Sequence, residues 1–309
     1  MADATTAQLR SAQALPSVHA LAAGPMRATL RPRDGGRIAS LWREEPNGRR
    51  TDVLVPMPEA AFDPAYWPKA GSYPLAPFSN RIRDAAFRFG EARVALVPHP
   101  AAAPHAQHGF SQMRPWTVTQ ETGTAIEMRY RHEPDEWPWA FEAVQRIALD
   151  PSGLTHEIAV ESLADTAMPV GLGIHPYFAV SQGDRIRFNA DALWEQDADG
   201  CGRQLVPLAG SAGHYDSRHA GKAATIYYAG WDGVASIHRQ DGTRILIQSA
   251  APLDHFVFHV PAGGGYLCLE PVSHVADAFN LAAAGHSGTG MRVLNPNEAI
   301  SAKVRIGLA

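Results

Sequence analysis

The chain has 309 residues, and its 27 Lys and Arg against 31 Asp and Glu leave a net charge of −4. That balance excludes the basic surface by which proteins bind nucleic acids or anionic membranes. A hydrophobic fraction of 45% excludes general disorder, and no apolar run reaches the roughly 18 residues of a membrane-spanning helix. The 27 glycines and 24 prolines favour many turns between short elements and argue against a helical bundle.

Residues 1–22 are rich in alanine and carry only a weak helical pattern, so we expect a flexible leader. Asp3, Pro16 and His19 interrupt this stretch, which does not fit a signal peptide. The two cysteines, Cys201 and Cys268, are too few for a disulfide framework or a structural zinc site. We therefore expect two free, buried thiols and a cytoplasmic location.

The remaining chain shows period-two rather than helical periodicity. Ile126, Met128 and Tyr130 alternate with polar residues, as a half-buried strand requires, and the pattern recurs at 156–160, 185–188 and 303–308. Asp241-Gly242 within 234–247 predicts a hairpin with a two-residue turn of positive φ. Long amphipathic helices and linkers are missing. The sequence therefore predicts an all-β fold, a large antiparallel β-sandwich, with residues 23–309 as a single domain.

Two segments in the first half of the chain concentrate polar groups. Asn80 and Arg81 offer an amide and a planar five-donor guanidinium, which suit hydroxyl or carboxylate partners. The alternative is a surface arginine in a salt bridge. His108 precedes Gly109, so a ring and an accessible backbone meet at one point. A structural histidine with satisfied hydrogen bonds is the alternative there.

Two further segments carry titratable groups beside proline. His175 lies between Gly173 and Pro176 in an extended segment, and a rigidly held histidine is a natural general acid. Glu270 ends an apolar strand before Pro271, where partial burial would raise its pKa toward that of a useful base. The alternatives are a core histidine and a structural ion pair.

Several common chemistries have no motif in the sequence. It contains no phosphate-binding loop, dinucleotide fingerprint, helical zinc motif or nucleophile elbow. His255 and His259 are separated by Phe256, Val257 and Phe258, which indicates a strand rather than the helix of a zinc site. We therefore predict neither a metal nor a cofactor.

Taken together and in this order, the four segments resemble the aldose 1-epimerase (galactose mutarotase) family, from about residue 27 to the C-terminus. The matching motifs are Asn80-Arg81, His108-Gly109, His175-Pro176-Tyr177-Phe178, Glu270-Pro271, and the final segment Gly290-Met291-Arg292-Val293-Leu294 with Pro296. The resemblance implies a supersandwich fold with an open sugar-binding cleft. It implies an isomerase that moves only protons and needs no cofactor.

The resemblance also implies roles for individual residues. His175 corresponds to the general acid that protonates the ring oxygen of a pyranose, and Glu270 to the general base that takes the anomeric proton. Arg81 and His108 correspond to residues that hold the sugar, and Asn80 and Tyr177 are further candidates for substrate contact. From residue type, Trp116, Trp137, Trp139 and Tyr177 are candidates for packing on the sugar face, although aromatic residues in a sandwich more often belong to the core.

One departure from the family pattern affects the expected substrate, a free aldohexose such as galactose or glucose. Many members carry a sugar-binding aspartate, but residues 223–234 contain only the late Asp232. Two alternatives therefore stay open. One is a hexose-6-phosphate 1-epimerase, with a basic pocket drawn from Arg83, Arg88 or Arg114. The other is a non-catalytic carbohydrate-binding protein. The oligomeric state stays open as well.

Overall fold

Two large antiparallel sheets account for most of the computed structural model, which describes residues 18–209, 213–216 and 223–309. The first sheet has eleven strands. In spatial order they are β1 (His19–Ala23), β2 (Met26–Arg31), β3 (Arg37–Glu44), β5 (Ser72–Leu75), β15 (Gly173–Ala179), β24 (Tyr266–Val272), β23 (His255–Val260), β20 (Ala224–Ala229), β17 (Ala192–Gln196) and β18 (Gly202–Pro207), with β4 (Arg50–Asp52) on β3.

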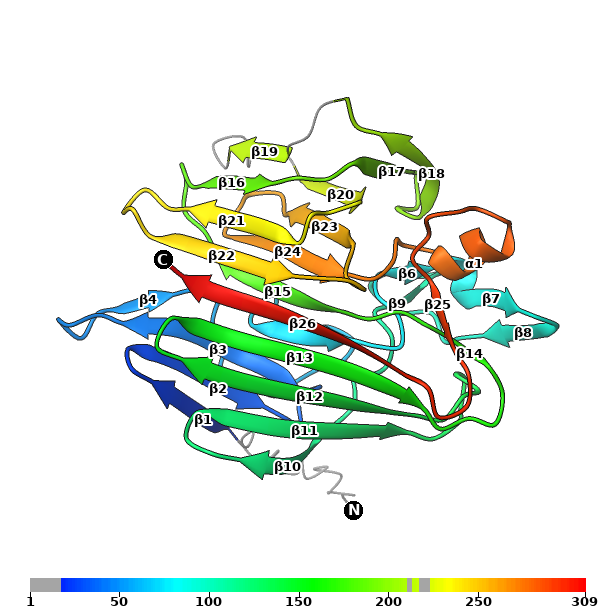
Figure 1. The fold of residues 1–309 in the computed structure, drawn as a ribbon, viewed down its shortest axis with the longest axis horizontal. Coiled ribbons are helices and arrows are strands. Elements are labelled where there is room, and N and C mark those ends of the chain that lie inside the picture. The colour runs from blue at the N-terminus through cyan, green and yellow to red at the C-terminus, as the bar shows by residue number, and fades with distance from the viewer. Residues whose placement is uncertain (1–17, 210–212, 217–222) are drawn as a thin grey trace, which may run out of the picture.

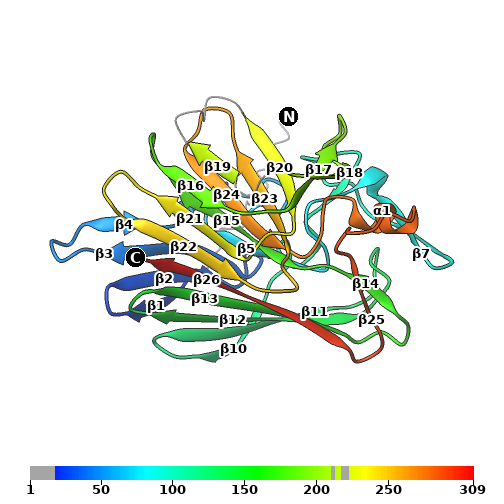
Figure 2. The ribbon, with the colours of Figure 1, turned by 45° about the horizontal axis from the view of Figure 1, so that its top comes forward.

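The second sheet has nine strands and covers one face of the first. Its spatial order is β10 (Thr117–Glu121), β11 (Ala125–His132), β12 (Phe141–Asp150), β13 (Gly153–Ser162), β26 (Ala299–Leu308), β22 (Arg244–Ser249), β21 (Val234–His238), β16 (Arg185–Phe188) and β19 (Gly213–Asp216). Figure 2 shows the long strands β12, β13 and β26 as one layer of this sandwich.

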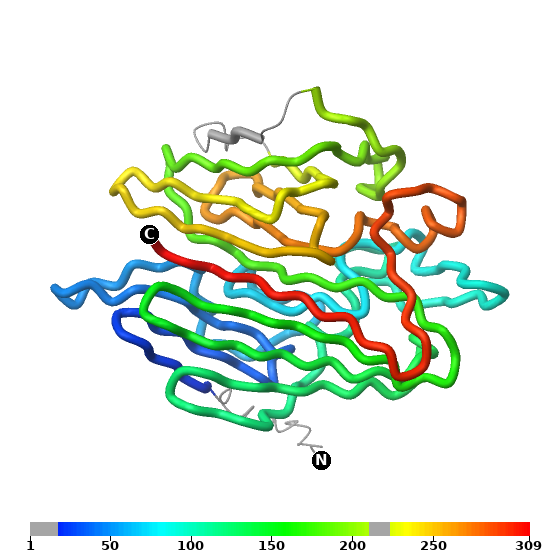
Figure 3. The backbone as a smooth tube through the Cα atoms, in the orientation of Figure 1, coloured from blue at the N-terminus to red at the C-terminus, as the bar shows by residue number. Residues whose placement is uncertain are grey.

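Short elements complete the described chain at one end of the sandwich (Figures 1 and 3). They are the pairs β6 (Arg81–Ile82) with β9 (Ala106–Gln107), β7 (Ala86–Phe89) with β8 (Ala92–Ala95) and β14 (Met168–Val170) with β25 (Arg292–Leu294), the 3-10 turn η1 (Arg83–Ala85) and the helix α1 (Ala278–Ala283). Within the described ranges no helix reaches the length and hydropathy of a membrane-spanning segment.

The predicted all-β fold is confirmed, and so are the strands read from alternation. The four alternating stretches lie in β11, β13, β16 and β26. Along β13 the side chains of Leu154, Ile158 and Val160 are fully buried between the sheets, while Glu157 and Glu161 point away from the core. The predicted buried, free thiols Cys201 and Cys268 are also found. Most of the predicted leader, residues 1–17, lies outside the described residues, and His19 begins β1.

The hairpin at 234–247 is confirmed, but its turn differs from the prediction. The backbone N–H of Gly242 donates to the carbonyl oxygen of Arg239, and Gly242 alone of the Asp241-Gly242 pair has a positive φ, of 87°. The connection is therefore a three-residue loop with one left-handed glycine rather than a two-residue turn. One glycine supplies the needed conformation, so Asp241 can keep the ordinary right-handed one.

Three tryptophans proposed to contact sugar lie instead in the hydrophobic core. Trp116, Trp137 and Trp139 are at most 6% exposed. Trp137 packs against Trp139 at a ring-centroid distance of 5.2 Å and against Phe87 at 5.5 Å. Phe279 on α1 packs against both Phe87 and Trp137. Trp116 packs elsewhere in the core, against Tyr130. Large aromatic side chains bury much apolar surface, and here that role prevails over ligand contact.

Candidate active site

A single row of cross-strand neighbours on the first sheet holds the central side chains of the candidate site. Tyr73 on β5 is the register partner of His175 on β15. The rungs Gly173–Val272 and Tyr177–Cys268 between β15 and β24 place His175 opposite Glu270. Beyond Glu270 the row continues through Val257 on β23 to Tyr227 on β20. Residues from distant parts of the sequence thus meet because their strands are adjacent.

His175 and Glu270, the predicted acid and base, are in direct contact. Nε2 of His175 lies 3.3 Å from Oε1 of Glu270, and the two residues are 7% and 3% exposed. Burial raises the pKa of Glu270 well above its ordinary value and lowers the pKa of His175 well below its own. The neighbouring basic groups of His108, His259 and Lys69 further disfavour protonation of His175. Both shifts disfavour the charged forms of the two side chains.

The surroundings of His175 fix the orientation of its ring. The ring stacks on that of Tyr177, two residues further along β15, at 4.7 Å between centroids. On the neighbouring strand β5, the ring centroid of Tyr73 lies 4.6 Å away. Nδ1 of His175 is buried and has no hydrogen-bond partner. At a buried atom without a hydrogen-bond partner, an unpaired lone pair costs less free energy than an unpaired N–H donor. The proton of the neutral ring is therefore on Nε2, which faces Glu270.

Loops bring the first two polar segments to the same place. Asn80 and His108 both have positive φ, 55° and 63°, and the backbone N–H of Asn80 donates to Nδ1 of His108 at 3.1 Å. The proton of the neutral His108 ring is therefore on Nε2, beside the amide of Gln107 at 3.1 Å. The side-chain oxygen of Asn80 accepts the backbone N–H of Arg81 at 3.0 Å. Burial lowers the pKa of His108 well below its ordinary value.

These residues line one open cavity of about 420 Å³. All six predicted site residues border it: Asn80, Arg81, His108, His175, Tyr177 and Glu270. Tyr177 does so with its hydroxyl already occupied, since Nε1–H of Trp67 donates to it at 3.3 Å. Its packing on His175 makes it a support for the ring as much as a ligand contact.

Sequence reasoning missed several residues that border the same cavity. They are Trp67, Lys69, Gln107, Thr225, His259 and Tyr266. Lys69 carries a positive charge with no carboxylate within 4.0 Å in the described part of the chain, and its Nζ lies 4.7 Å from the centre of the Trp67 ring. Burial lowers the pKa of Lys69. No motif surrounds Lys69 in the sequence, whereas alternation along 255–260 could have placed His259 on the face of Val257.

The position of the aspartate expected in many family members is filled differently. Residues 224–229 form β20, and Thr225 borders the cavity while its hydroxyl lies 2.9 Å from Nδ1 of His259. The hydroxyl of Tyr227 lies 3.2 Å from Oδ1 of Asn80. Asp232 does not border the cavity, and its carboxylate accepts a hydrogen bond from the side-chain amide of Asn189 at 2.7 Å. Asp232 is therefore not the substitute.

The arginines considered for a phosphate pocket lie elsewhere. Arg83 pairs with Asp197, Asp199 and Asp277. Arg114 pairs with Asp135, and Arg88 is exposed on β7. None of the three borders the cavity that holds His175 and Glu270, so that basic pocket is not formed.

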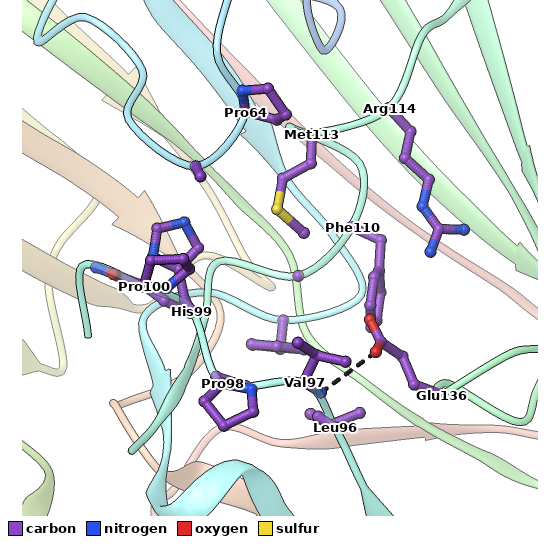
Figure 4. Close-up of a pocket in the computed structure, with 15 residues that line it drawn as sticks. Pro64, Leu96, Val97, Pro98, His99, Pro100, Phe110, Met113, Arg114 and Glu136 are labelled. Carbon is purple, nitrogen blue, oxygen red and sulfur yellow. Dashed lines mark hydrogen bonds between the residues drawn. The ribbon is translucent and has the colours of Figure 1, made fainter. Parts of the chain in front are cut away.

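A second cavity, of about 360 Å³, adjoins Gln107 but has a different character. Figure 4 shows it lined by Pro64, Leu96, Val97, Pro98, Phe110 and Met113, with Glu136 accepting the backbone N–H of Val97 at 3.2 Å. Its only charged side chains are Arg114, which is paired with Asp135, and Glu136. It lacks an acid and base in contact, so the first cavity is the candidate active site.

Comparison with known proteins agrees with this geometry. A curated relative, an uncharacterized protein of Escherichia coli K12 named YphB, is 26% identical over 258 residues, 79% of this chain and 83% of its own. A crystal structure of an E. coli K12 protein proposed to be an aldose 1-epimerase has a TM-score of 0.81 at 22% identity, with 95% and 99% of the chains covered. A galactose mutarotase-like protein from Clostridium acetobutylicum has a TM-score of 0.80 at 18% identity, covering 96% and 99%.

The two solved structures show the same supersandwich fold. The family assignment comes from the aldose 1-epimerase family model, which matches residues 24–307. Apart from β1 and the last residue of β26, that range contains both sheets, and it contains every residue of the cavity. The chain belongs to the aldose 1-epimerase family of sugar isomerases.

Proposed function

We propose that this protein interconverts the α and β anomers of a free aldohexose of the galactose or glucose type, by opening and reclosing the pyranose ring. The observation that carries the proposal is the contact of His175 Nε2 with Glu270 Oε1, 3.3 Å apart at the wall of an open cavity. The two oxygens that exchange protons in this reaction, O1 and O5, are bonded to the same carbon. An acid and a base that serve both must therefore lie close together.

The chemistry requires His175 as the imidazolium and Glu270 as the carboxylate, a pair with the same number of protons as a neutral ring beside a protonated carboxyl. Glu270 takes the proton of the anomeric O1–H, while the imidazolium of His175 donates its Nε2 proton to O5 and becomes the neutral ring. The C1–O5 bond breaks, its electron pair goes to O5, and C1 becomes the aldehyde carbon. After rotation about C1–C2, O5 attacks the other face of the aldehyde. His175 then takes back the O5 proton and Glu270 returns its proton to O1, so the pair ends with the proton count it began with.

The other predicted residues position the sugar. Arg81 has no carboxylate within 4.0 Å in the part of the chain described, so its guanidinium is available to sugar hydroxyls. Nε2–H of His108 is a second donor whose direction is set by the bond from Asn80 to Nδ1. Tyr177 supports the ring of His175 from one side. These contacts hold C1 beside the acid and base.

One observation favours a second candidate substrate, a hexose that carries an anionic group such as a 6-phosphate. Lys69 and Arg81 both border the cavity without a carboxylate partner among the described residues, whereas Glu270 is the only acidic residue of its lining. This surplus of positive charge contrasts with the net charge of −4 of the whole chain. An anionic substituent would offset it.

The test is polarimetry of freshly dissolved α-D-glucose and α-D-galactose, with wild-type protein and with His175→Ala and Glu270→Gln. We expect each variant to lose about 10²- to 10⁴-fold in kcat/KM, the usual share of one acid or base. His238→Ala and Glu195→Gln change the same residue types outside the cavity and are expected to keep the wild-type rate. Wild-type rates in both site variants would refute the assigned roles.

The same assay with glucose 6-phosphate and Lys69→Met distinguishes the candidates. If the physiological sugar is neutral, Lys69→Met changes kcat/KM for glucose and for its phosphate by similar factors. If the physiological sugar is anionic, glucose 6-phosphate is the better substrate of the wild type. Lys69→Met then lowers kcat/KM for glucose 6-phosphate but not for glucose. If calorimetry shows that the wild-type protein binds sugar but polarimetry shows no acceleration of mutarotation, the protein is instead a non-catalytic carbohydrate-binding protein.

A further inference from the structure

Cys268 lies beneath the acid and base but has no part in the proton transfers proposed above. It is two residues before Glu270 on β24, so both side chains point to the same face of the sheet. It is fully buried and is the register partner of Tyr177 on β15 and of His259 on β23. Its Sγ, Nε2 or Nδ1 of His175 and a carboxylate oxygen of Glu270 all lie within 4.8 Å of one another.

We propose that His175, Cys268 and Glu270 form a binding site for a thiophilic divalent ion such as Zn²⁺, and that the ion inhibits the enzyme by occupying its acid and base. This inference rests on the proposed function only for its inhibitory consequence. The binding site itself follows from the arrangement of the three donors.

The distances suit tetrahedral zinc. With Zn–N and Zn–O bonds of about 2.0 Å to 2.1 Å, the nitrogen and oxygen ligands of a tetrahedral ion are about 3.3 Å apart. Nε2 of His175 and Oε1 of Glu270 have that separation, 3.3 Å, without any ion. A sulfur ligand belongs about 3.6 Å from each, so Sγ needs to approach by at most about 1.2 Å from its limit of 4.8 Å. A rotation of the Cys268 or Glu270 side chain can supply that movement.

The charges also suit a divalent ion. One thiolate and one carboxylate balance Zn²⁺, and the imidazole binds as a neutral ligand, so the buried complex has no net charge. Coordination breaks the S–H bond of Cys268: the electron pair stays on sulfur and is donated to the ion, while the proton leaves to solvent. A proton held by Glu270 leaves in the same way. The ring proton of His175 moves from Nε2 to Nδ1, so the ring stays neutral and Nε2 offers its lone pair to the ion. Lys69 opposes binding electrostatically, as it acts on both Cys268 and His175.

The ion would have three protein ligands and an open fourth position toward the cavity of about 420 Å³, where water or a sugar hydroxyl completes the tetrahedron. With Nε2 and a carboxylate oxygen coordinated, neither group can move a proton at O1 or O5. Zn²⁺ and a productively bound sugar would therefore exclude each other.

The direct test uses metal-free protein titrated with CoCl₂ and with ZnCl₂. We expect a thiolate-to-cobalt charge-transfer band in the near ultraviolet with wild type and with Cys201→Ser, and no band with Cys268→Ser or Cys268→Ala. Zn²⁺ affinity, measured against a chromogenic chelator, should fall in both Cys268 variants by more than about tenfold, the size of effect that even a lost outer-shell partner of a ligand produces. Using Ser and Ala guards against one variant failing to fold.

The inhibitory consequence is tested by mutarotation in the presence of ZnCl₂. Wild type should lose activity when ZnCl₂ is added and regain it when EDTA removes the ion. Cys268→Ser should keep its basal rate and need at least about tenfold more Zn²⁺ for the same inhibition. The proposal is overturned if wild type gives no thiolate band, or if the Cys268 variants bind Zn²⁺ as tightly as wild type. If no sugar is turned over but the band depends on Cys268, the proposed function fails and the metal site stands.

Discussion

His156, in the middle of β13, makes the stability of the fold depend on pH in a way that can be calculated. Its side chain is 1% exposed, Nε2 lies 2.8 Å from Oε1 of Gln145, and Nδ1 has no partner. Nε2–H therefore donates to Gln145, and protonating Nδ1 would place an unsatisfied donor in the core. Burial accordingly lowers the pKa of His156 from 6.5 to about 4.

The sign and size of the effect follow from that pKa shift. Because the folded pKa is below the unfolded one, the unfolded chain takes up a proton first as the pH falls, and stability is lost between pH 6.5 and about 4. The difference of about 2.5 units, at about 1.36 kcal/mol per unit, sets a limit of about 3.4 kcal/mol. Between about pH 7 and about pH 4.5 the loss from this one histidine is about 2.4 kcal/mol.

The perturbation is His156→Gln, which keeps a donor for Gln145 but cannot titrate. Urea unfolding of wild type and variant at both pH values gives two free-energy differences, and any constant cost of the substitution cancels between them. The variant should lose about 2.4 kcal/mol less than wild type on acidification. His19→Gln, at a partly exposed histidine, serves as control. Equal pH dependence in wild type and His156→Gln would refute the reasoning.

Three further predictions concern the site and the core. Burial raises the pKa of Glu270, so its ionisation destabilises the folded protein as the pH rises above the ordinary value of 4.5. Glu270→Gln should therefore raise the Tm at neutral pH even though it lowers kcat/KM, and a lower Tm in calorimetry would contradict this. Because the Trp137 ring fills the core, Trp137→Ala should lower the free energy of unfolding in urea by about 3–5 kcal/mol. Trp137→Phe should keep the wild-type kcat/KM, and a large loss of kcat/KM in this variant would show that Trp137 contacts the sugar. Gly109→Ala should destabilise the fold more than Gly90→Ala. Both glycines have positive φ, of 65° and 58°, so an alanine at either position brings backbone strain of about 1–3 kcal/mol, but only at Gly109 would its Cβ lie 2.4 Å from the carbonyl oxygen of Ala76. Equal urea midpoints for the two variants would show that this contact does not affect stability.

The sequence predicted the architecture well where local pattern decides it. Alternation placed β11, β13, β16 and β26, because a strand with one buried face must repeat every two residues. The turn at Asp241-Gly242 was predicted with the wrong length, since loop length depends on strand register as well as on the turn residues. The core position of Trp137 and Trp139 could not be read from residue type, which is the same for a core aromatic and a ligand-binding one.

The candidate site was predictable only in part. His175 and Glu270 stood out because each precedes a proline at an apolar strand, and the structure brings them into contact. Lys69 and Tyr227 had no such signal. Tyr227 lies on β20, which β23 separates from β24, and Lys69 lies in the segment before β5, the neighbour of β15. Both positions depend on strand order, which is a property of the whole sheet. The functional roles of all these residues stay predictions until the variants are measured.

His175 and Glu270 lie on two adjacent strands of one sheet, so the proposed proton transfers depend on different parts of the fold from those that would select the sugar. The backbone positions of the proposed proton donor and acceptor are fixed by the register of two neighbouring strands, so they change only if that register shifts. Lys69, Gln107 and Pro261, by contrast, lie on loops or short pairs around the rim. Exchanging those rim segments between relatives should therefore redirect specificity without redesigning the reaction, which makes this sheet a scaffold for engineering sugar isomerases.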